Sequence, residues 1–235
     1  MYSRRSYTFG LVGESADLHA NVQDSVHTDE GHWRVGLLHF SAPNAPRNIT
    51  EDNNVLTYYT SAGQATKVIV PPGAYSLTSL LDAIQGRLPK PEIIQLLGNN
   101  STKQVGLYST VHIDLRADKS LHKILGFAPI FLRSHQWYIS TEPVELRHLE
   151  TIRIHCNIVA GSFGVNGPNT VLHEFAPRSP IGYPLLEKPR HIIYLPINSH
   201  QRVTEIIVTL TDQQNRPLDF GGHRIHARLH LVRWD

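Results

Sequence analysis

The sequence has little charge, a single cysteine and no long apolar run. Cys156 is the one cysteine among 235 residues, which excludes an internal disulfide framework and is typical of folding in a reducing compartment. Charged residues make up 18%, and the formal net charge of +2 is too small for strong nonspecific binding of nucleic acid. No window reaches the roughly 18 apolar residues of a membrane helix, and residues 1–13 lack the apolar run of a signal peptide. We therefore expect a soluble protein that is made in the cytosol.

Apolar residues occur in the amount and the pattern of an all-β protein. They make up 40% of the chain, beside 16 glycines and 15 prolines, which is enough for a hydrophobic core and many turns. In residues 151–159 every second residue is apolar, as in a strand with one face on the core: Ile152, Ile154, Cys156 and Ile158. Strand-length runs also occur at 33–40, 55–59, 66–70, 105–108, 110–115, 191–197, 203–210 and 225–234.

Helices are scarce in the expected structure. One begins after an N-cap at Ser76 and ends at Pro89, with apolar residues at helical spacing: Leu77, Leu80, Leu81, Ile84 and Leu88. A second helical turn spans 120–125 and stops at Gly126. Since a parallel α/β sheet needs a helix after nearly every strand, we predict one antiparallel jelly-roll β-sandwich over residues 31–235, with the first helix packed against it. The polar residues 1–30 are expected to form a partly mobile N-terminal arm.

Histidine, a common metal ligand, is unusually abundant, with 15 copies. Its densest cluster is His223, His226 and His230. In a strand, residues 226 and 230 share a face but lie about 13 Å apart, whereas each ligand of a zinc ion lies only about 2 Å from it. His223 falls on the opposite parity. We therefore predict no metal site, and we expect these histidines on a solvated or interface face.

No other residue pattern predicts catalysis. Cys156 is on the apolar parity of its strand, which is typical of a core residue rather than a thiolate nucleophile. Asp114 and Asp118 could form a pair of acids, but Asp118 opens a helical turn, where an acidic residue favours the helix N-terminus. Residues 161–167 are rich in glycine but lack the following Lys-Ser/Thr and helix of a phosphate loop, so a flexible connection is expected. We expect no enzyme, no catalytic residue and no cofactor.

Signals for nucleic acid and for glycosylation are equally thin. Arg4 and Arg5 form an isolated pair, and no stripe of aromatic and basic residues accompanies them, so no sequence-specific nucleic-acid partner is predicted. Asn48 and Asn99 begin glycosylation sequons, which count for little without a secretory signal.

Several segments, in order along residues 30–233, resemble one group of capsid proteins. The most distinctive are Pro71-Pro72-Gly73-Ala74-Tyr75, which leads into the expected helix, and Leu125-Gly126-Phe127. Others are 31–37 with 48–49, 154–159, and the ending 206–233 with its Phe-Gly-Gly turn. The chain departs from the pattern at His155, where an aromatic residue is usual, and at Asn157, where Asp is usual. The group is the penton, or minor capsid, proteins of Maverick/Polinton elements and adintovirus-like viruses, related in architecture to the adenovirus penton base.

This resemblance implies a structural virion protein. Such a protein forms pentamers at capsid vertices beside a separate double-jelly-roll major capsid protein. It is made in the host cytoplasm, with nuclear assembly as an option. Exposed aromatic residues could anchor the subunit contacts, or could be ordinary core: Trp33, Trp137, Tyr138 and Trp234. Two alternatives stay open, namely a carbohydrate- or protein-binding β-sandwich, which could be a domesticated copy in a host genome, and a cupin-like metalloenzyme.

Overall fold

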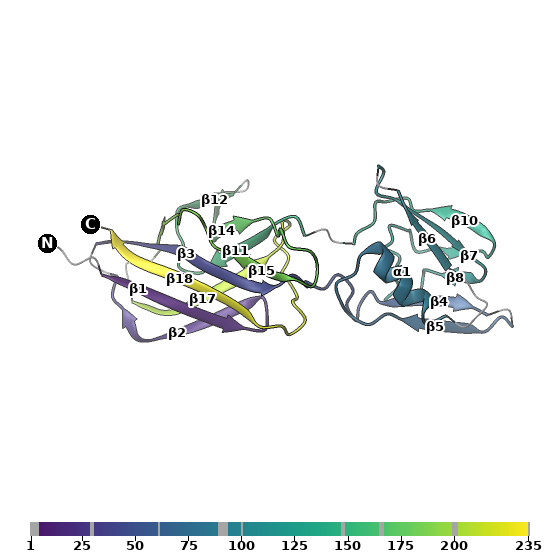
Figure 1. Ribbon diagram of the computed structural model, residues 1–235, viewed down its shortest axis with the longest axis horizontal. Helices are drawn as coiled ribbons and strands as arrows, with labels where there is room; N and C mark the ends of the chain where they lie inside the picture. Colours follow the sequence, from purple (N-terminus) through teal and green to yellow (C-terminus); the bar gives the residue numbers. More distant parts are fainter. Residues whose placement is uncertain are drawn as a thin grey trace. The chain divides into compact units, whose positions relative to one another are not determined.

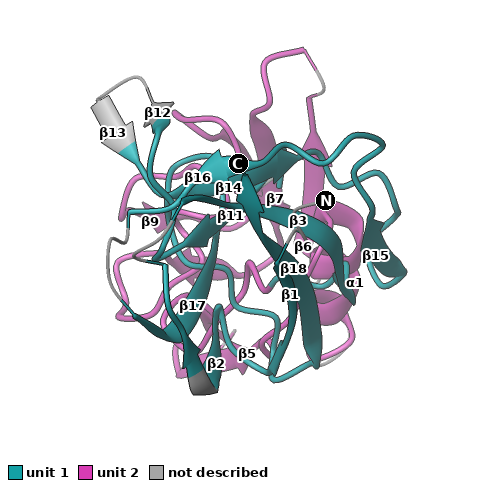
Figure 2. Ribbon diagram, turned by 90° about the vertical axis from the view of Figure 1, so that its left-hand side faces the viewer, with its two compact units in different colours: residues 1–46, 149–235 teal, residues 47–148 magenta. Residues whose placement is uncertain are grey.

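The computed structural model shows an antiparallel β protein that divides into two compact units (Figures 1 and 2). It describes residues 5–28, 31–60, 62–88, 94–99, 101–146, 149–164, 167–198 and 202–234. Unit 1 consists of residues 1–46 and 149–235, and unit 2 of residues 47–148. Unit 2 is therefore inserted into the chain of unit 1.

Unit 1 contains two main sheets. The first has the strand order β1 (Ser6–Gly13), β18 (Ile225–Trp234), β3 (His32–Pro43) and β15 (Pro184–Glu187), and β16 (Leu195–Pro196) also pairs with β3. The second has the order β14 (Val171–Phe175), β11 (Ile152–Cys156), β17 (Val203–Thr211) and β2 (Asp17–Val26). A separate hairpin joins β12 (Ser162–Gly164) to β13 (Gly167–Asn169), where the sequence predicted only a flexible connection.

The strand pairing of unit 1 is that of a jelly roll. Counting the eight main strands in chain order, the first pairs with the eighth, the second with the seventh, the third with the sixth and the fourth with the fifth. All four pairs are antiparallel. This nested pairing arises when one long antiparallel ribbon folds over into two facing sheets. The all-β jelly-roll prediction is therefore confirmed, within unit 1.

The core of unit 1 follows the predicted parity. In β11, Ile152, Ile154 and Cys156 are fully buried, whereas Arg153 and His155 are only partly buried. Facing strands complete the core with side chains such as Phe40 and Leu229. The alternation works because successive side chains of a strand point to opposite faces of its sheet.

Much of the segment 1–30, which the sequence predicted as a partly mobile arm, consists of paired strands. Residues 6–13 and 17–26 form β1 and β2, which pair with β18 and β17. Each strand supplies a buried leucine to the core, Leu11 and Leu18. Few other described side chains of these strands are buried, so the local sequence shows little of the apolar alternation that predicts a strand. The strands form because they pair with segments about 200 residues later in the chain.

Unit 2 has its own two sheets and its own core. One sheet has the order β5 (Ala65–Ile69), β4 (Val55–Tyr59), β8 (His112–Asp114) and β9 (Phe131–Leu132); the other has β10 (Gln136–Ile139), β7 (Val105–Ser109) and β6 (Ile94–Gly98). The prediction of one domain over residues 31–235 differs from this division. Residues 47–148 have the same strand-and-turn pattern as their surroundings, so the sequence does not reveal the insertion.

The predicted helix is present, but in unit 2. Helix α1 (Leu77–Gln85) begins after Ser76, whose side chain accepts a hydrogen bond from the Ser79 amide, as predicted for the N-cap. Leu80 and Ile84 are buried in the core of unit 2, whereas the sequence predicted that they pack against the jelly roll. Residues 121–126 form consecutive turns rather than a helix. Of the expected strand 191–197, Leu195 and Pro196 pair with β3, and Ile197 forms an isolated bridge with Val159.

Candidate functional site

The histidines of the closing strand lie on the outer face of the first sheet. His226 is exposed and stands opposite Val12 and Ser41. His230 is hydrogen-bonded through Nδ1 to the Tyr194 hydroxyl at 2.7 Å. Their neighbours Ala227 and Leu229 point into the core instead. Across the described ranges of the chain, no cluster of three or more His, Cys, Asp or Glu side chains is arranged to hold a metal ion.

The other residues that the sequence analysis considered for catalysis are buried or hydrogen-bonded to neighbouring groups. Cys156 is fully buried, and this burial raises the pKa of its thiol to about 11. Asp114 accepts two hydrogen bonds from the Arg116 guanidinium, at 2.8 and 2.9 Å, and these lower the pKa of its carboxyl. Asp118 accepts a hydrogen bond from the next main-chain amide, that of Lys119. The two acids therefore contact different groups.

The four aromatic candidates divide into core and surface. Trp33 is 5% exposed and belongs to the core of unit 1. Trp234 is exposed and packs its ring under the Arg34 guanidinium, 4.8 Å from the ring centre. The half-buried Tyr138 donates a hydrogen bond from its hydroxyl to the side-chain oxygen of Gln136. Arg4 lies outside the described residues, and Arg5 is exposed.

Trp137 belongs to an apolar patch on the β6–β7–β10 sheet of unit 2. Leu97 and Ile139 are also exposed, and together the three side chains border a shallow pocket of about 300 Å³. The Trp137 ring lies close over Gly106, where a Cβ atom would meet it at 3.5 Å. Large apolar side chains that are exposed side by side are typical of a contact surface.

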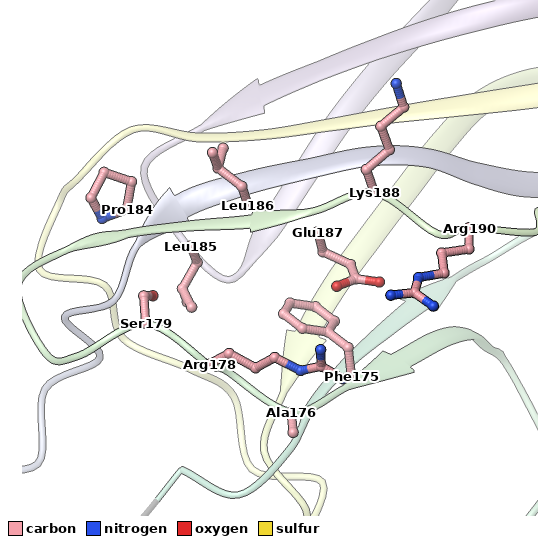
Figure 3. Close-up of a pocket in the computed structure, with 10 residues that line it drawn as sticks. All are labelled: Phe175, Ala176, Arg178, Ser179, Pro184, Leu185, Leu186, Glu187, Lys188 and Arg190. Carbon is pink, nitrogen blue, oxygen red and sulfur yellow. The ribbon is translucent and has the colours of Figure 1, made fainter.

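A larger pocket, of about 750 Å³, opens on one flank of the jelly roll. We call this side the β14–β15 flank, because β14 and β15 are the end strands of their two sheets there. The pocket is lined by the end of β14, the loop after it, β15 and the segment that follows (Figure 3). Its volume lies within the range of known ligand pockets.

Asn44 fixes the loop that forms the floor of this pocket. Its side-chain amide donates to the main-chain oxygen of Ser179 at 2.5 Å. Its main-chain amide donates to the oxygen of Tyr183 at 2.7 Å, and its own oxygen accepts from the Gly182 amide at 2.8 Å. The loop is therefore held in place before any partner binds, which reduces the entropic cost of binding.

The pocket is electropositive. Its cations are Arg178, Lys188 and Arg190, and its one acid is Glu187. The Glu187 carboxylate is hydrogen-bonded to Nε2 of His173 at 3.0 Å, so it already has a partner. Figure 3 shows the guanidinium groups of Arg178 and Arg190 turned toward the same part of the pocket, while the Lys188 amine points away.

One polar atom of the pocket has no partner among the described residues. The hydroxyl oxygen of Ser179 is buried and makes no hydrogen bond. A buried hydroxyl without a partner is costly.

The sequence did not single out the residues of this pocket. Arg178, Glu187 and Arg190 lie in a segment rich in proline, which reads as an ordinary loop. The one available signal was charge, because residues 176–190 contain three cations and one acid. The pocket also depends on two contacts between residues that are not sequence neighbours. Asn44 contacts Ser179, and His173 contacts Glu187, so neither contact produces a local sequence pattern.

Among the described residues, no helix has the length and apolar content needed to cross a bilayer. No protein-family model matches the sequence, and no curated protein matches it. Among solved structures, the chain is similar to the crystal structure of the mavirus penton protein. The two share 11% identity with a TM-score of 0.49, over 98% of this chain and 100% of that chain.

Proposed function

We propose that the chain is a structural capsid protein, a penton that forms rings of five copies at the vertices of a virus capsid beside a double-jelly-roll major capsid protein. The observation that carries this proposal is the complete jelly-roll pairing of unit 1, a topology that recurs in capsid proteins. The ordered sequence motifs over residues 30–233 add to it. The protein would then act in the virion after synthesis in the host cytoplasm.

A structural role also fits how the side chains are used. The space between the two sheets is filled by apolar side chains, among them Phe40 and Phe220. Large apolar side chains are instead exposed on the outside of both units, such as Leu186 in unit 1 and Ile139 in unit 2. Exposed apolar surface of this kind is typical of protein contacts.

Assembly is the test of this function. Co-expression with the cognate major capsid protein should give particles with density for this chain at the fivefold vertices. The purified chain, when concentrated, should show the mass of a pentamer by light scattering and fivefold rings in negative-stain images. Particles whose vertices contain another chain would show that the penton assignment is wrong.

The apolar patch of unit 2 supports a second candidate, carbohydrate binding. Jelly rolls also occur in lectins, and an exposed tryptophan beside a shallow pocket can stack on a sugar ring. Trp137 has both properties. A glycan array would test this candidate, with Trp137→Ala as the variant and Trp234→Ala as the exposed control. A monomer that binds a glycan through Trp137 would favour this function over the penton.

A cupin-like metalloenzyme gains no support from the fold. In such a protein the metal lies within the sandwich, but here that space is occupied by the apolar core. His226 and His230 are on the outer face instead. Elemental analysis of protein purified without a tag tests this alternative, and one tightly held equivalent of metal would support it.

A further inference from the structure

We propose that the β14–β15 pocket of one copy receives Glu14 of a second copy, so that opposite flanks of the jelly roll form the contact of the ring. This inference rests on the proposed function, since it assumes that copies of the chain form a ring. It adds which surfaces meet and which charges pair. The opposite flank, formed by β1 and β2, is called the β1–β2 flank, because these are the end strands of the two sheets on that side.

The two flanks carry opposite charge. Residues 6–26, which form β1, β2 and their turn, contain the acids Glu14, Asp17 and Asp24 and no lysine or arginine. Residues 176–190 contain three cations and one acid, a formal charge of +2. The described cations beside β1 are Arg5, which precedes the strand at the end opposite Glu14, and Arg228 of β18, which stands opposite Gly10. Complementary charge on opposite flanks favours head-to-tail contact between identical copies.

Glu14 is suited to enter the pocket. It is exposed in the turn after β1, and no hydrogen bond or ion pair engages it within the described part of the chain. Asp17 is less suited, because its carboxylate accepts a hydrogen bond from the Thr209 hydroxyl at 2.6 Å. A carboxylate can accept hydrogen bonds from two guanidinium groups at once. Arg178 and Arg190 offer these donors.

The two surfaces lie at the same level of the first sheet. Val12 stands opposite His226, His226 opposite Ser41, and Ser41 opposite Leu186. This row crosses all four strands and ends in an exposed apolar side chain on each flank. Val12 is 50% exposed and Leu186 is 71% exposed. Glu14 follows two residues after Val12, and the pocket extends from β15 on both sides of Leu186.

Copies that are related by rotation about an axis along the sandwich would therefore bring matching groups together. Leu186 of one copy would face Val12 of the next, and the basic pocket would face Glu14. Exposed Ile181 and Tyr183 of the loop would add apolar area. Such a contact joins two different surfaces, so it is heterologous, and it closes into a ring when the rotation is an integral fraction of a turn.

Cross-linking between two single-cysteine variants tests the contact. Glu14→Cys and Arg178→Cys proteins are mixed at high concentration and treated with a short bismaleimide. We expect cross-linked dimers in the mixture and at least about tenfold less in either variant alone, because each contact joins two different flanks. The unmodified chain is the background control, since its one cysteine is buried. Cross-linking of Glu14→Cys to itself would show a twofold contact and overturn the inference.

Charge reversal gives a second, independent readout. Glu14→Lys should weaken self-association about tenfold or more, as should the double change of Arg178→Glu with Arg190→Glu. Combining all three changes should restore assembly. Lys67→Glu, an exposed cation of unit 2, is the matched control and should assemble like the parent. Rings that survive every variant would overturn this contact and leave the penton proposal intact, whereas a parent chain that forms no ring, alone or with the major capsid protein, would overturn both.

Discussion

The side-chain amide of Asn44 donates a hydrogen bond to the main-chain oxygen of Ser179, and this 2.5 Å contact joins the end of β3 to a loop 135 positions later. Asn44 is 6% exposed, so water does not replace the bond if it is lost. The same residue makes two main-chain hydrogen bonds with Gly182 and Tyr183. One buried side chain thereby fixes the shape of the basic pocket.

We expect Asn44→Ala to destabilise unit 1 by about 1–3 kcal/mol, since the Ser179 oxygen loses its donor. Urea unfolding measures this loss, and the assembly assay should show weaker rings because the loop is no longer held. Asn21→Ala, an exposed asparagine in β2, is the control and should cost under about 0.5 kcal/mol. Equal losses in the two variants would mean that the Asn44 contact does not stabilise the loop.

Ile154→Ala in β11 should cost about 2–5 kcal/mol, because it leaves a cavity in the core of unit 1. Arg153→Ala should cost less, about 1 kcal/mol, since its ion pair with Glu174 at 2.8 Å is partly solvated. The cost is not zero, because the Arg153 guanidinium also donates to the Gln213 main-chain oxygen. Chemical denaturation of the two variants measures both losses of stability. A larger loss for Arg153→Ala than for Ile154→Ala would contradict the assignment of Ile154 to the buried face of β11.

Gly126→Ala should destabilise unit 2 strongly. Its φ is +73°, and an added Cβ would lie 2.2 Å from the Glu142 main-chain oxygen. Gly63→Ala is the matched control, because Gly63 has a similar φ of +78° but open space around it. We expect about 1–2 kcal/mol for Gly63→Ala from backbone strain alone, and a clearly larger loss for Gly126→Ala. Similar losses would show that the contact with Glu142 is relieved by movement.

The stability of unit 1 should fall with mild acid through His155. Burial lowers the pKa of this imidazole, and the positive charge of Arg153 lowers it further. The unfolded chain therefore takes up a proton at about pH 6.5 while the folded chain does not. The stabilising contribution is present above that pH and is lost as the pH falls from there toward the folded pKa. Urea midpoints measured from pH 7.5 to 5 should show this slope.

His155→Gln should flatten that slope, whereas His226→Gln, which removes an exposed histidine, should keep it. The His155 ring is hydrogen-bonded to the hydroxyls of Thr211, at 2.9 Å, and Thr170, at 3.2 Å. Glutamine can hydrogen-bond to a hydroxyl without titrating. An unchanged slope in His155→Gln would assign the acid sensitivity to another group.

Cys156 should resist alkylation in the folded protein. Its thiol has a raised pKa of about 11 and is buried, so little reactive thiolate exists at pH 8. Labelling with iodoacetamide, followed by mass spectrometry, should be slow in buffer and fast in 6–8 M urea, where the chain exposes the thiol. Rapid labelling in buffer would mean that β11 opens readily, and it would also raise the background of the cross-linking experiment.

The sequence by itself determined the features that depend on neighbouring residues. The alternation at 151–159 predicts which side chains of β11 are buried, because side chains in a strand alternate between faces. Ser76 and the apolar spacing after it predict α1, since an N-cap and a helical period are local properties. Gly126 was predicted as a stop, and its positive φ explains why glycine is required there.

Tertiary structure alone decided the features that join distant parts of the chain. Residues 6–13 are a strand because β18 lies beside them, and residues 47–148 are a separate unit because they bury their own core. The basic pocket likewise needs Asn44 to hold the loop that carries Arg178. Hydrogen bonds and packing across more than 100 residues leave no periodic trace in the local sequence, so these features appear only when the chain is folded.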